Sequence, residues 1–203
     1  MQDQNQNQPN FELETQQDEI KNSIKSFIWE TVKIIIVSLI IIVPIRYYVI
    51  QPFYVQGASM EPNFFDKEYL IIDELSYRLN EPQRGDVVVF KYPKSPKDFF
   101  IKRIIALPNE KITISNNQIK IYNTDYPNGF ILDETEYLPP DTKTPNEIEA
   151  TLSTNEYFVI GDNRVSSLDS RSFGSITLND MIGKTWLRGW PISRFTIFEN
   201  PEY

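Results

Sequence analysis

The stretch "KITISNNQIKIY", Lys111 to Tyr122, decides what kind of fold this chain adopts. Isoleucines alternate with polar residues on both sides of Asn116-Asn117, a pair that tolerates the left-handed backbone conformations of a tight turn. Because successive side chains of a strand point to opposite faces of a sheet, each half of the stretch can bury its isoleucines on one face. The stretch therefore predicts a β-hairpin.

Short apolar runs divided by turn residues continue through the rest of the chain after residue 50. We expect further strands in "YLIIDEL", "DVVVFKY", "DFFIKRII", "EYFVIG" and "RFTIF", with no internal repeat and no long amphipathic helix. Residues 126–153, rich in Pro, Asp, Glu and Thr, have weak periodicity and are expected to form an insertion or long loop that sets no function. The pattern predicts a mostly β domain over residues 51–203.

A continuous apolar run precedes this domain. The row "IIIVSLIIIVPI", Ile34 to Ile45, is interrupted only by Ser38 and Pro44, and its apolar flanks extend it to the roughly 20 residues with which a helix crosses a bilayer. No small-x-small cleavage site follows the run, which disfavours a cleaved signal peptide. We predict one transmembrane helix over residues 27–50.

The residues before the helix are polar and indicate its orientation. Residues 1–26 are predicted to form a disordered polar tail, because their N-terminal part is rich in Gln, Asn and acidic residues. Lys21, Lys25 and Lys33 precede the apolar run, against only Arg46 close behind it. The positive-inside rule then places the tail in the cytoplasm and the β domain outside.

The composition excludes several kinds of site. The chain contains no histidine and no cysteine, so a Ser-His-Asp triad, a Cys-His pair and a His/Cys metal site are all impossible. The net charge of −8 argues against a nucleic-acid partner, because nucleic-acid binding needs clustered Lys and Arg. We expect no metal and no cofactor.

Ser59, in "YVQGASMEPNF", is a candidate nucleophile if a base can accept its proton. Without imidazole, the remaining bases are carboxylates, tyrosines and lysines, and burial can lower the pKa of a lysine from about 10.4 into the useful range. In "FFIKRIIAL", Lys102 shares a strand face with Phe100 and Ile104, whereas Arg103 points to the other face. One of the two cations must lie among apolar groups, and the alternative to a buried Lys102 is a solvated Lys102 beside a paired, buried Arg103.

A third segment, "GDNRVSSLDSRSFG", follows the apolar run "YFVI". Its acidic and basic residues can form charge-assisted hydrogen bonds that fix a loop, with Asp169 paired to Arg171 or to Arg164. A solvated turn is the alternative. Loops that follow a buried strand are nevertheless common places for function.

Taken together and in this order, the apolar run, "GASMEP", "RGDVVVF", "FIKRIIALP" and "GDNRVSSLDSR" resemble the bacterial type I signal peptidases. These are membrane-anchored Ser-Lys proteases, and the resemblance extends from the transmembrane segment almost to the C-terminus. It implies a signal-peptidase-like β-sheet catalytic domain in the bacterial cell membrane. It also implies cleavage of secretory pre-proteins after small-x-small (Ala-x-Ala-like) sites through an acyl-enzyme.

The resemblance also implies roles for individual residues. Ser59 would be the nucleophile and Lys102 its general base, with Ser167 orienting the lysine amine. Residues that match the supporting loop of the family are Asp162, Arg164, Asp169 and Arg171. Residues that match the substrate pocket are Val55, Met60, Phe64, Phe100 and Ile101, with Met60 expected to pack near the lysine.

The chain departs from the family pattern at a few positions. Gly57 stands where some members carry a hydroxyl that helps stabilise the oxyanion, so the backbone N–H of Ser59 would supply more of that stabilisation. Asn63 stands where Thr is usual, and "ALPNE" replaces a turn richer in Gly.

Two other functions are compatible with the motifs. One is another Ser-Lys protease of the same fold, such as a self-cleaving repressor, which the apolar run and the absence of a DNA-binding segment oppose. The other is a membrane-anchored module that only binds partners. A serine-directed acylating inhibitor distinguishes an enzyme from a binding module, because it would label Ser59 in an enzyme and leave a binding module unmodified.

Overall fold

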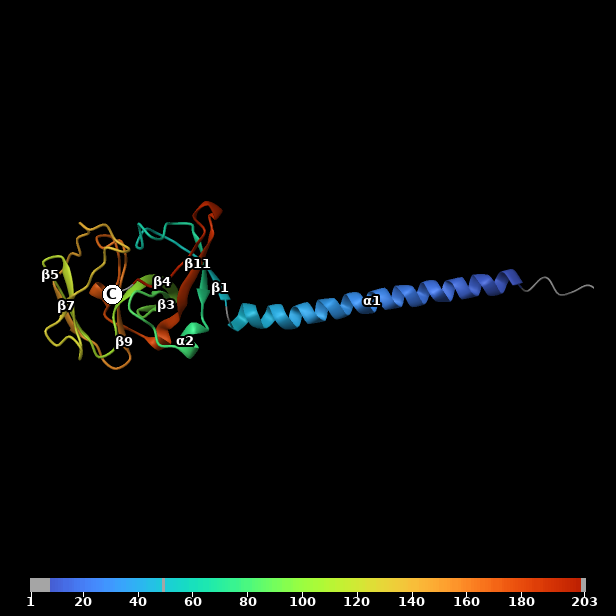
Figure 1. The fold of residues 1–203 in the computed structure, drawn as a ribbon, viewed down its shortest axis with the longest axis horizontal. Helices are drawn as coiled ribbons and strands as arrows, with labels where there is room; N and C mark the ends of the chain where they lie inside the picture. The colour runs from blue at the N-terminus through green and yellow to red at the C-terminus, as the bar shows by residue number, and fades with distance from the viewer. Residues whose placement is uncertain (1–7, 49, 202–203) are drawn as a thin grey trace, which may run out of the picture. The chain divides into compact units, whose positions relative to one another are not determined.

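The chain divides into two compact units, residues 1–47 and 48–203, and the computed structural model describes residues 8–48 and 50–201. The described residues of the first unit all lie in one helix, α1 (Gln8–Tyr48) (Figure 1). Its segment Lys21–Val43 is long and apolar enough to cross a membrane, by length and composition. The side chains of residues 21–43 are exposed, and from Ile34 to Val43 all of them except Ser38 are apolar, which gives a surface of the kind that a bilayer covers.

Helix α1 begins earlier than predicted. Residues 8–26 are helical, whereas the sequence analysis expects disorder there; residues 1–7 lie outside the described residues. The segment contains no glycine, and its one proline, Pro9, lies in the first turn, where the missing N–H has no helical partner to lose. Gln, Glu and Lys are good helix formers, so the helix of the apolar run continues into the polar segment.

The second unit is mostly β, as predicted, and contains two sheets. The large sheet has the order β1-β2-β11-β3-β4-β9-β10, and β12 pairs with β11. Its strands are β1 (Ile50–Tyr54), β2 (Tyr69–Asp73), β3 (Val87–Tyr92), β4 (Ser95–Ala106), β9 (Glu156–Ile160), β10 (Ile176–Thr177), β11 (Met181–Trp190) and β12 (Thr196–Ile197).

The small sheet contains the predicted hairpin, which is confirmed. Its order is β7-β6-β5-β8, with β5 (Lys111–Ser115), β6 (Gln118–Tyr122), β7 (Phe130–Ile131) and β8 (Ile148–Thr151). Ile112 pairs with Ile121 across the hairpin, and the turn residues Asn116 and Asn117 have φ of 51° and 62°. Figure 1 shows β5 and β7 at one end of this unit and β1 and β11 at the other.

The segment 126–153 is not a loop throughout, because it supplies β7 and β8. β8 pairs with β5 and β7 pairs with β6, which widens the hairpin into a four-stranded sheet. Phe130, Ile148 and Ala150 pack against the hydrophobic core of this sheet. These strands are too short to produce a clear alternating pattern in the sequence.

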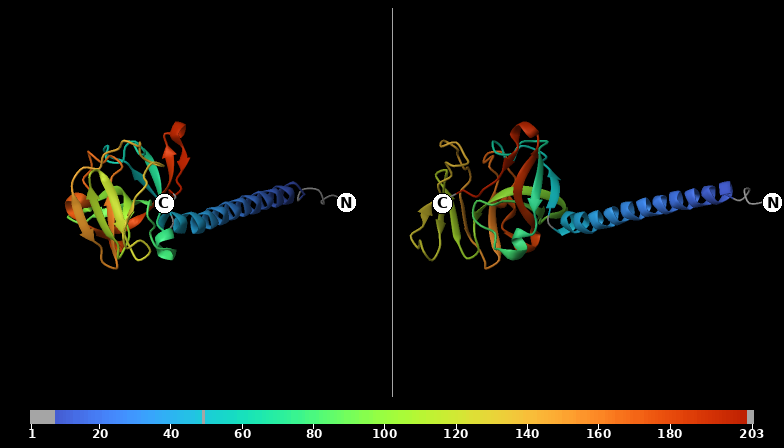
Figure 2. Two further views of the ribbon diagram at one scale, coloured as in Figure 1. Left: turned by 60° about the vertical axis from the view of Figure 1, so that its left-hand side comes forward. Right: turned by 45° about the vertical axis from the view of Figure 1, so that its right-hand side comes forward.

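Short helices and turns connect the strands. They are α2 (Ser76–Leu79), α3 (Ser170–Phe173), and the 3₁₀ helices η1 (Leu178–Asp180) and η2 (Ile192–Arg194). The hairpin formed by β11 and β12, with η2 at its tip, projects beyond the rest of the unit (Figure 2).

Strand β3 is buried on both faces, and this determines the surroundings of the neighbouring strand β4. Val87 and Val89 belong to one core cluster, and Val88 and Phe90 belong to another. Val87 pairs with Arg103 and Val88 pairs with Lys102. Both cationic side chains of β4 therefore lie on faces of the sheet that are buried.

Candidate active site

Ser59 lies in a turn within the loop, residues 55–68, that joins β1 to β2. The turn is closed at its base by backbone hydrogen bonds of 2.9 and 3.0 Å that join Val55 to Glu68 and to Lys67. Gly57 has φ of +87°, which favours glycine, and its N–H donates to the carboxylate of Asp66 at 2.9 Å. Ser59 is partly exposed, so its hydroxyl is held at the surface on a fixed backbone.

Lys102 reaches Ser59 from strand β4. Its Nζ donates to Ser59 Oγ at 2.8 Å and to the backbone carbonyl of Ile101 at 2.7 Å. Lys102 is buried, with 4% of its surface exposed. Burial lowers the pKa of Lys102 from 10.5 to about 8, although the carboxylates of Asp169 and Asp162 act to raise it. At neutral pH, roughly a tenth of the molecules therefore carry a neutral amine next to the hydroxyl.

Arg103, the next residue, is buried on the other face of β4. Its guanidinium makes two hydrogen bonds with the carboxylate of Asp162, of 2.9 and 2.7 Å, and a third with the carbonyl of Gly85 at 2.9 Å. The sequence analysis expected one of the two cations to be buried, and the structure buries both. Of the two, only Arg103 is paired with a carboxylate; within the described residues, Lys102 forms no ion pair.

The loop from Gly161 to Gly174 contains an internal ion pair, between Asp169 and Arg171. Asp169 receives two hydrogen bonds of 2.8 Å from the guanidinium of Arg171, and one of 3.0 Å from the N–H of Gly161. Of the two partners considered for Asp169, Arg171 is therefore the one observed. Burial acts to raise the pKa of Asp169, but Arg171, with smaller contributions from the Gly161 N–H and the Ser167 hydroxyl, holds it below its usual value.

Arg164 supports the same loop through a different partner. Its guanidinium donates to the carboxylate of Glu134 and, at 2.8 Å, to the hydroxyl of Thr144. Asp162, which the sequence analysis grouped with Arg164, is paired with Arg103 instead. Both residues lie in the predicted support, but each connects the loop to a different part of the fold.

Gly161 is a residue that the sequence analysis missed. A Cβ at this position would lie 2.4 Å from the backbone oxygen of Ser59 and 2.2 Å from Ser167 Oγ. Asn163 N–H also donates to the Ser59 carbonyl at 3.0 Å. The loop and the nucleophile turn therefore touch backbone to backbone, which no periodicity in the sequence could reveal.

Ser167 lies next to Gly161, because a Cβ added to Gly161 would come within 2.2 Å of Ser167 Oγ and 2.4 Å of the backbone oxygen of Ser59. Across the part of the chain that the structure describes, no hydrogen bond joins Ser167 to Lys102, whose amine donates to Ser59 and to Ile101. The orienting role of Ser167 stays a prediction.

A cleft of about 590 Å³ opens next to Ser59 and Lys102. Three of the predicted pocket residues, Val55, Phe100 and Ile101, line it. The sequence analysis missed further lining residues, of which the apolar ones are Phe53, Leu70, Val89, Phe99 and Leu168. Phe53 could have been found, because it lies two residues before Val55 on the same strand face.

Met60 and Phe64 are not among the side chains that line this cleft, and their place in the substrate pocket stays a prediction. Each is 1% exposed, and both belong to the core cluster beneath the turn. The inner face of the turn must be apolar to pack on Leu70 and Ile72, and these two side chains supply that surface. Met60 also contacts the support loop, since its Sδ accepts from Asp162 N–H at 3.5 Å.

Two strand edges flank the cleft. Within the described residues, β1 pairs with β2 alone, and β4 pairs with β9 only from Arg103 onward. Phe53 on β1 and Phe99 on β4 approach with their ring centroids 5.7 Å apart. The backbone groups of β1 and of the first half of β4 on the cleft side are therefore available to an extended peptide.

No metal site emerges from the described part of the chain, where no three carboxylate, histidine or cysteine groups come close enough to hold an ion. The site consists of a hydroxyl, a buried amine and an apolar cleft. This combination suits nucleophilic acyl transfer at a peptide carbonyl.

Comparison with known proteins agrees with this class of chemistry. The family model described as "Signal peptidase, peptidase S26" matches residues 28–190, so the chain belongs to the signal peptidase family, a family of serine-type peptidases. A probable signal peptidase I-2 from Synechocystis sp. is 34% identical over 167 residues, which cover 80% of this chain and 73% of the relative. Signal peptidase IB from Staphylococcus aureus strain COL is 30% identical over 190 residues, which cover 88% of this chain and 98% of the relative.

A solved structure, the signal peptidase I from Enterococcus faecalis V583, is also similar. It is 27% identical to this chain, with a TM-score of 0.42, over 52% of this chain and 97% of the solved one.

Proposed function

We propose that this chain is a single-pass membrane endopeptidase that removes N-terminal signal peptides from exported pre-proteins, using Ser59 as nucleophile and Lys102 as general base. One observation carries the proposal: the Lys102 amine donates to the Ser59 hydroxyl at 2.8 Å from a buried position. A nucleophile needs a base within hydrogen-bond reach, and this base has a pKa of about 8 because it is buried.

The reaction follows from this geometry. Neutral Lys102 accepts the proton of Ser59 as Oγ bonds to the scissile carbonyl carbon. The resulting ammonium returns the proton to the leaving amine as the peptide C–N bond breaks, which leaves an acyl ester on Ser59. A water molecule then attacks the ester as Lys102 accepts one of its protons. Lys102 passes this proton to Oγ as the C–Oγ bond breaks, which releases the new carboxyl terminus and restores the Ser59 hydroxyl and the neutral amine.

Stabilisation of the oxyanion is assigned to the backbone N–H of Ser59. Gly57 offers no side chain for this purpose, and its φ of +87° would strain any replacement that carried one. The carboxylate of Asp66 fixes the backbone on the approach to Ser59 through the Gly57 N–H. The donor of the oxyanion site is thus preorganised by backbone geometry.

The cleft supports binding of the substrate as an extended strand. Unpaired edges of β1 and β4 can form main-chain hydrogen bonds, which give affinity without regard to sequence. The apolar lining beside Ser59 accepts small side chains, so selection of Ala-x-Ala-like sites is the specificity that we assign.

We assign the protein to the bacterial cytoplasmic membrane, with its N-terminus inside and the β unit outside. The candidate span in α1 and the three lysines ahead of it support this orientation. The partners of the protein are then the lipid bilayer and the signal peptides of secretory pre-proteins.

Cleavage of a secretory precursor tests the proposal. The full chain in detergent should cut a precursor with an Ala-x-Ala site, at that site, and a precursor with bulky residues in place of both alanines should remain intact. Absence of cleavage across several precursors, with a folded protein that also resists a serine-directed acylating inhibitor, would reject the enzyme and favour a binding module.

A further inference from the structure

The loop that joins β7 to β8 contacts the active site at several points, although the sequence gives it no function. Its central residue is Tyr137, which is partly exposed and does not line the cleft. Three different parts of Tyr137 connect to the three segments that carry the proposed machinery: the turn of Ser59, the strand of Lys102 and the loop after Gly161.

The first connection runs from the backbone of Tyr137 to the nucleophile turn. The side-chain amide of Asn63 donates to the carbonyl of Tyr137 at 2.8 Å and to the carboxylate of Asp162 at 2.8 Å. Asn63 belongs to the turn itself, because its N–H donates to the carbonyl of Met60 at 3.1 Å. Asn63 is also one of the positions at which this chain departs from the family pattern.

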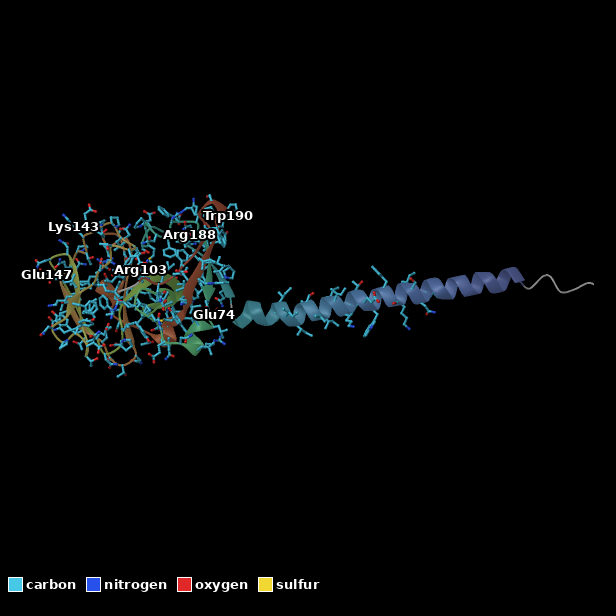
Figure 3. All side chains as sticks on the ribbon, viewed as in Figure 1. Glu74, Arg103, Lys143, Glu147, Arg188 and Trp190 are labelled. Atoms are coloured by element: carbon cyan, nitrogen blue, oxygen red, sulfur yellow. The ribbon has the colours of Figure 1, made fainter. Side chains whose placement is uncertain are left out.

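The second connection runs from the ring of Tyr137 to strand β4. The guanidinium of Arg103 lies over the ring, with its carbon 4.0 Å from the ring centroid. Arg103 is adjacent to Lys102 and holds Asp162 with two hydrogen bonds. Figure 3 shows Arg103 within the β unit and Lys143, from the same loop as Tyr137, at its periphery.

The third connection runs from the hydroxyl of Tyr137 to the support loop. It donates to Glu134 at 2.7 Å, and the same carboxylate binds the buried guanidinium of Arg164. Arg164 is further held by Thr144, which lies seven residues beyond Tyr137 in the same connection.

We propose that Tyr137 is a positioning residue that fixes the Ser59 turn, strand β4 and the Gly161–Gly174 loop relative to one another. It acts through Asn63, Arg103 and Glu134 rather than on the reacting atoms themselves. Transfer of a proton between Oγ and Nζ depends on their separation, and small displacements from a distance lower the rate of such steps strongly. The inference rests on the proposed function of Ser59 and Lys102.

Two variants of Tyr137, with a matched control, test this role. Tyr137→Leu removes the ring and the hydroxyl and should lower kcat about tenfold, with KM within about twofold of the wild-type value, because the cleft is unchanged. Tyr137→Phe keeps the ring over Arg103 and should retain most of the activity. The control is Tyr126→Leu, which removes an aromatic ring that contacts Phe130 instead, and it should leave kcat unchanged.

All rates should be divided by the concentration of Ser59 that an acylating inhibitor titrates, so that partial unfolding does not lower them. A Tyr137→Leu kcat within about twofold of wild type, or an equal loss in Tyr126→Leu, would overturn the role. If Tyr137→Leu does not fold, Asn63→Ala takes its place, with a several-fold loss of kcat expected and an unchanged kcat counting against the role. Failure of the wild type itself to cleave would instead reject the proposed function.

Discussion

Lys102 and Arg103 are neighbours on β4, and both are buried, yet the two faces of the strand provide opposite environments for a positive charge. Arg103 has a bidentate carboxylate and a backbone carbonyl around its guanidinium. Lys102 has a serine hydroxyl and a backbone carbonyl, and burial lowers its pKa to about 8. The difference shows that one face is built to hold a permanent cation, and the other to give up a proton.

The largest expected effect comes from removing either member of the proposed catalytic pair. Ser59→Ala, Lys102→Ala and Lys102→Arg should each lower kcat by about 10³-fold or more, the last because a guanidinium does not deprotonate. The measurement is cleavage of an Ala-x-Ala precursor under single-turnover conditions. Substantial activity in Lys102→Arg would show that another group accepts the proton of Ser59.

The two cations should have opposite effects on stability. Arg103→Met leaves the carboxylate of Asp162 buried without its partner and should lower the free energy of unfolding by about 3–5 kcal/mol. Lys102→Met should instead raise it, by up to about 3 kcal/mol below pH 8, because the lowered pKa makes the folded state bind the lysine proton less tightly than the unfolded state. This contribution disappears as the pH rises toward 10.5.

Denaturant unfolding of both variants in detergent at pH 7 and pH 10 measures these changes. A stabilising effect of Arg103→Met, or a destabilising effect of Lys102→Met at pH 7, would contradict the contrast between the two faces.

Gly161→Ala tests the contact between the support loop and the nucleophile turn. The added Cβ would collide with the backbone of Ser59, and the forced displacement should lower kcat by about 10²-fold. Gly189→Ala is the matched control, since its Cβ would meet Leu187 at an ordinary 3.7 Å. Comparable kcat values for the two alanine variants would show that the turn does not depend on this contact.

Part of the site was predictable from local pattern. The alternation in "FFIKRIIAL" placed Lys102 with Phe100 on one face and Arg103 on the other, and the structure agrees, with Lys102 Nζ 5.3 Å from the centroid of the Phe100 ring. The hairpin around Asn116-Asn117 was predictable for the same reason. Both depend only on residues that are close together in sequence.

The rest depends on contacts between distant segments. Asp162 and its partner Arg103 are 59 residues apart in sequence, and Arg164 and its partner Glu134 are 30 residues apart. The charges alone therefore could not identify these partners among the oppositely charged residues that are closer in sequence. Met60 and Phe64 were assigned to the pocket because apolar residues beside a nucleophile can line a cleft or support it from below. Only the packing of the turn decides between these two positions.

The smallest expected effect concerns an exposed ion pair, Lys111 with Glu149, whose charged atoms are 2.7 Å apart. Glu149→Gln should leave the free energy of unfolding almost unchanged, because solvent screens the pair. Thermal unfolding of this variant beside Arg103→Met measures the contrast. A change as large as that of Arg103→Met would show that burial does not separate the two kinds of ion pair.

The most direct test of the central claim is the pH dependence of kcat/KM with two different amines at position 102. Because the chain contains no cysteine, Lys102→Cys introduces a unique thiol, and aminoethylation of it restores a lysine-like side chain whose amine has a lower pKa. With the natural lysine, kcat/KM should fall about tenfold per pH unit below about 8, since only the neutral amine accepts the proton of Ser59. The modified enzyme should be active, and this fall should begin at lower pH; an active modified enzyme with an unshifted profile would contradict Lys102 as the base.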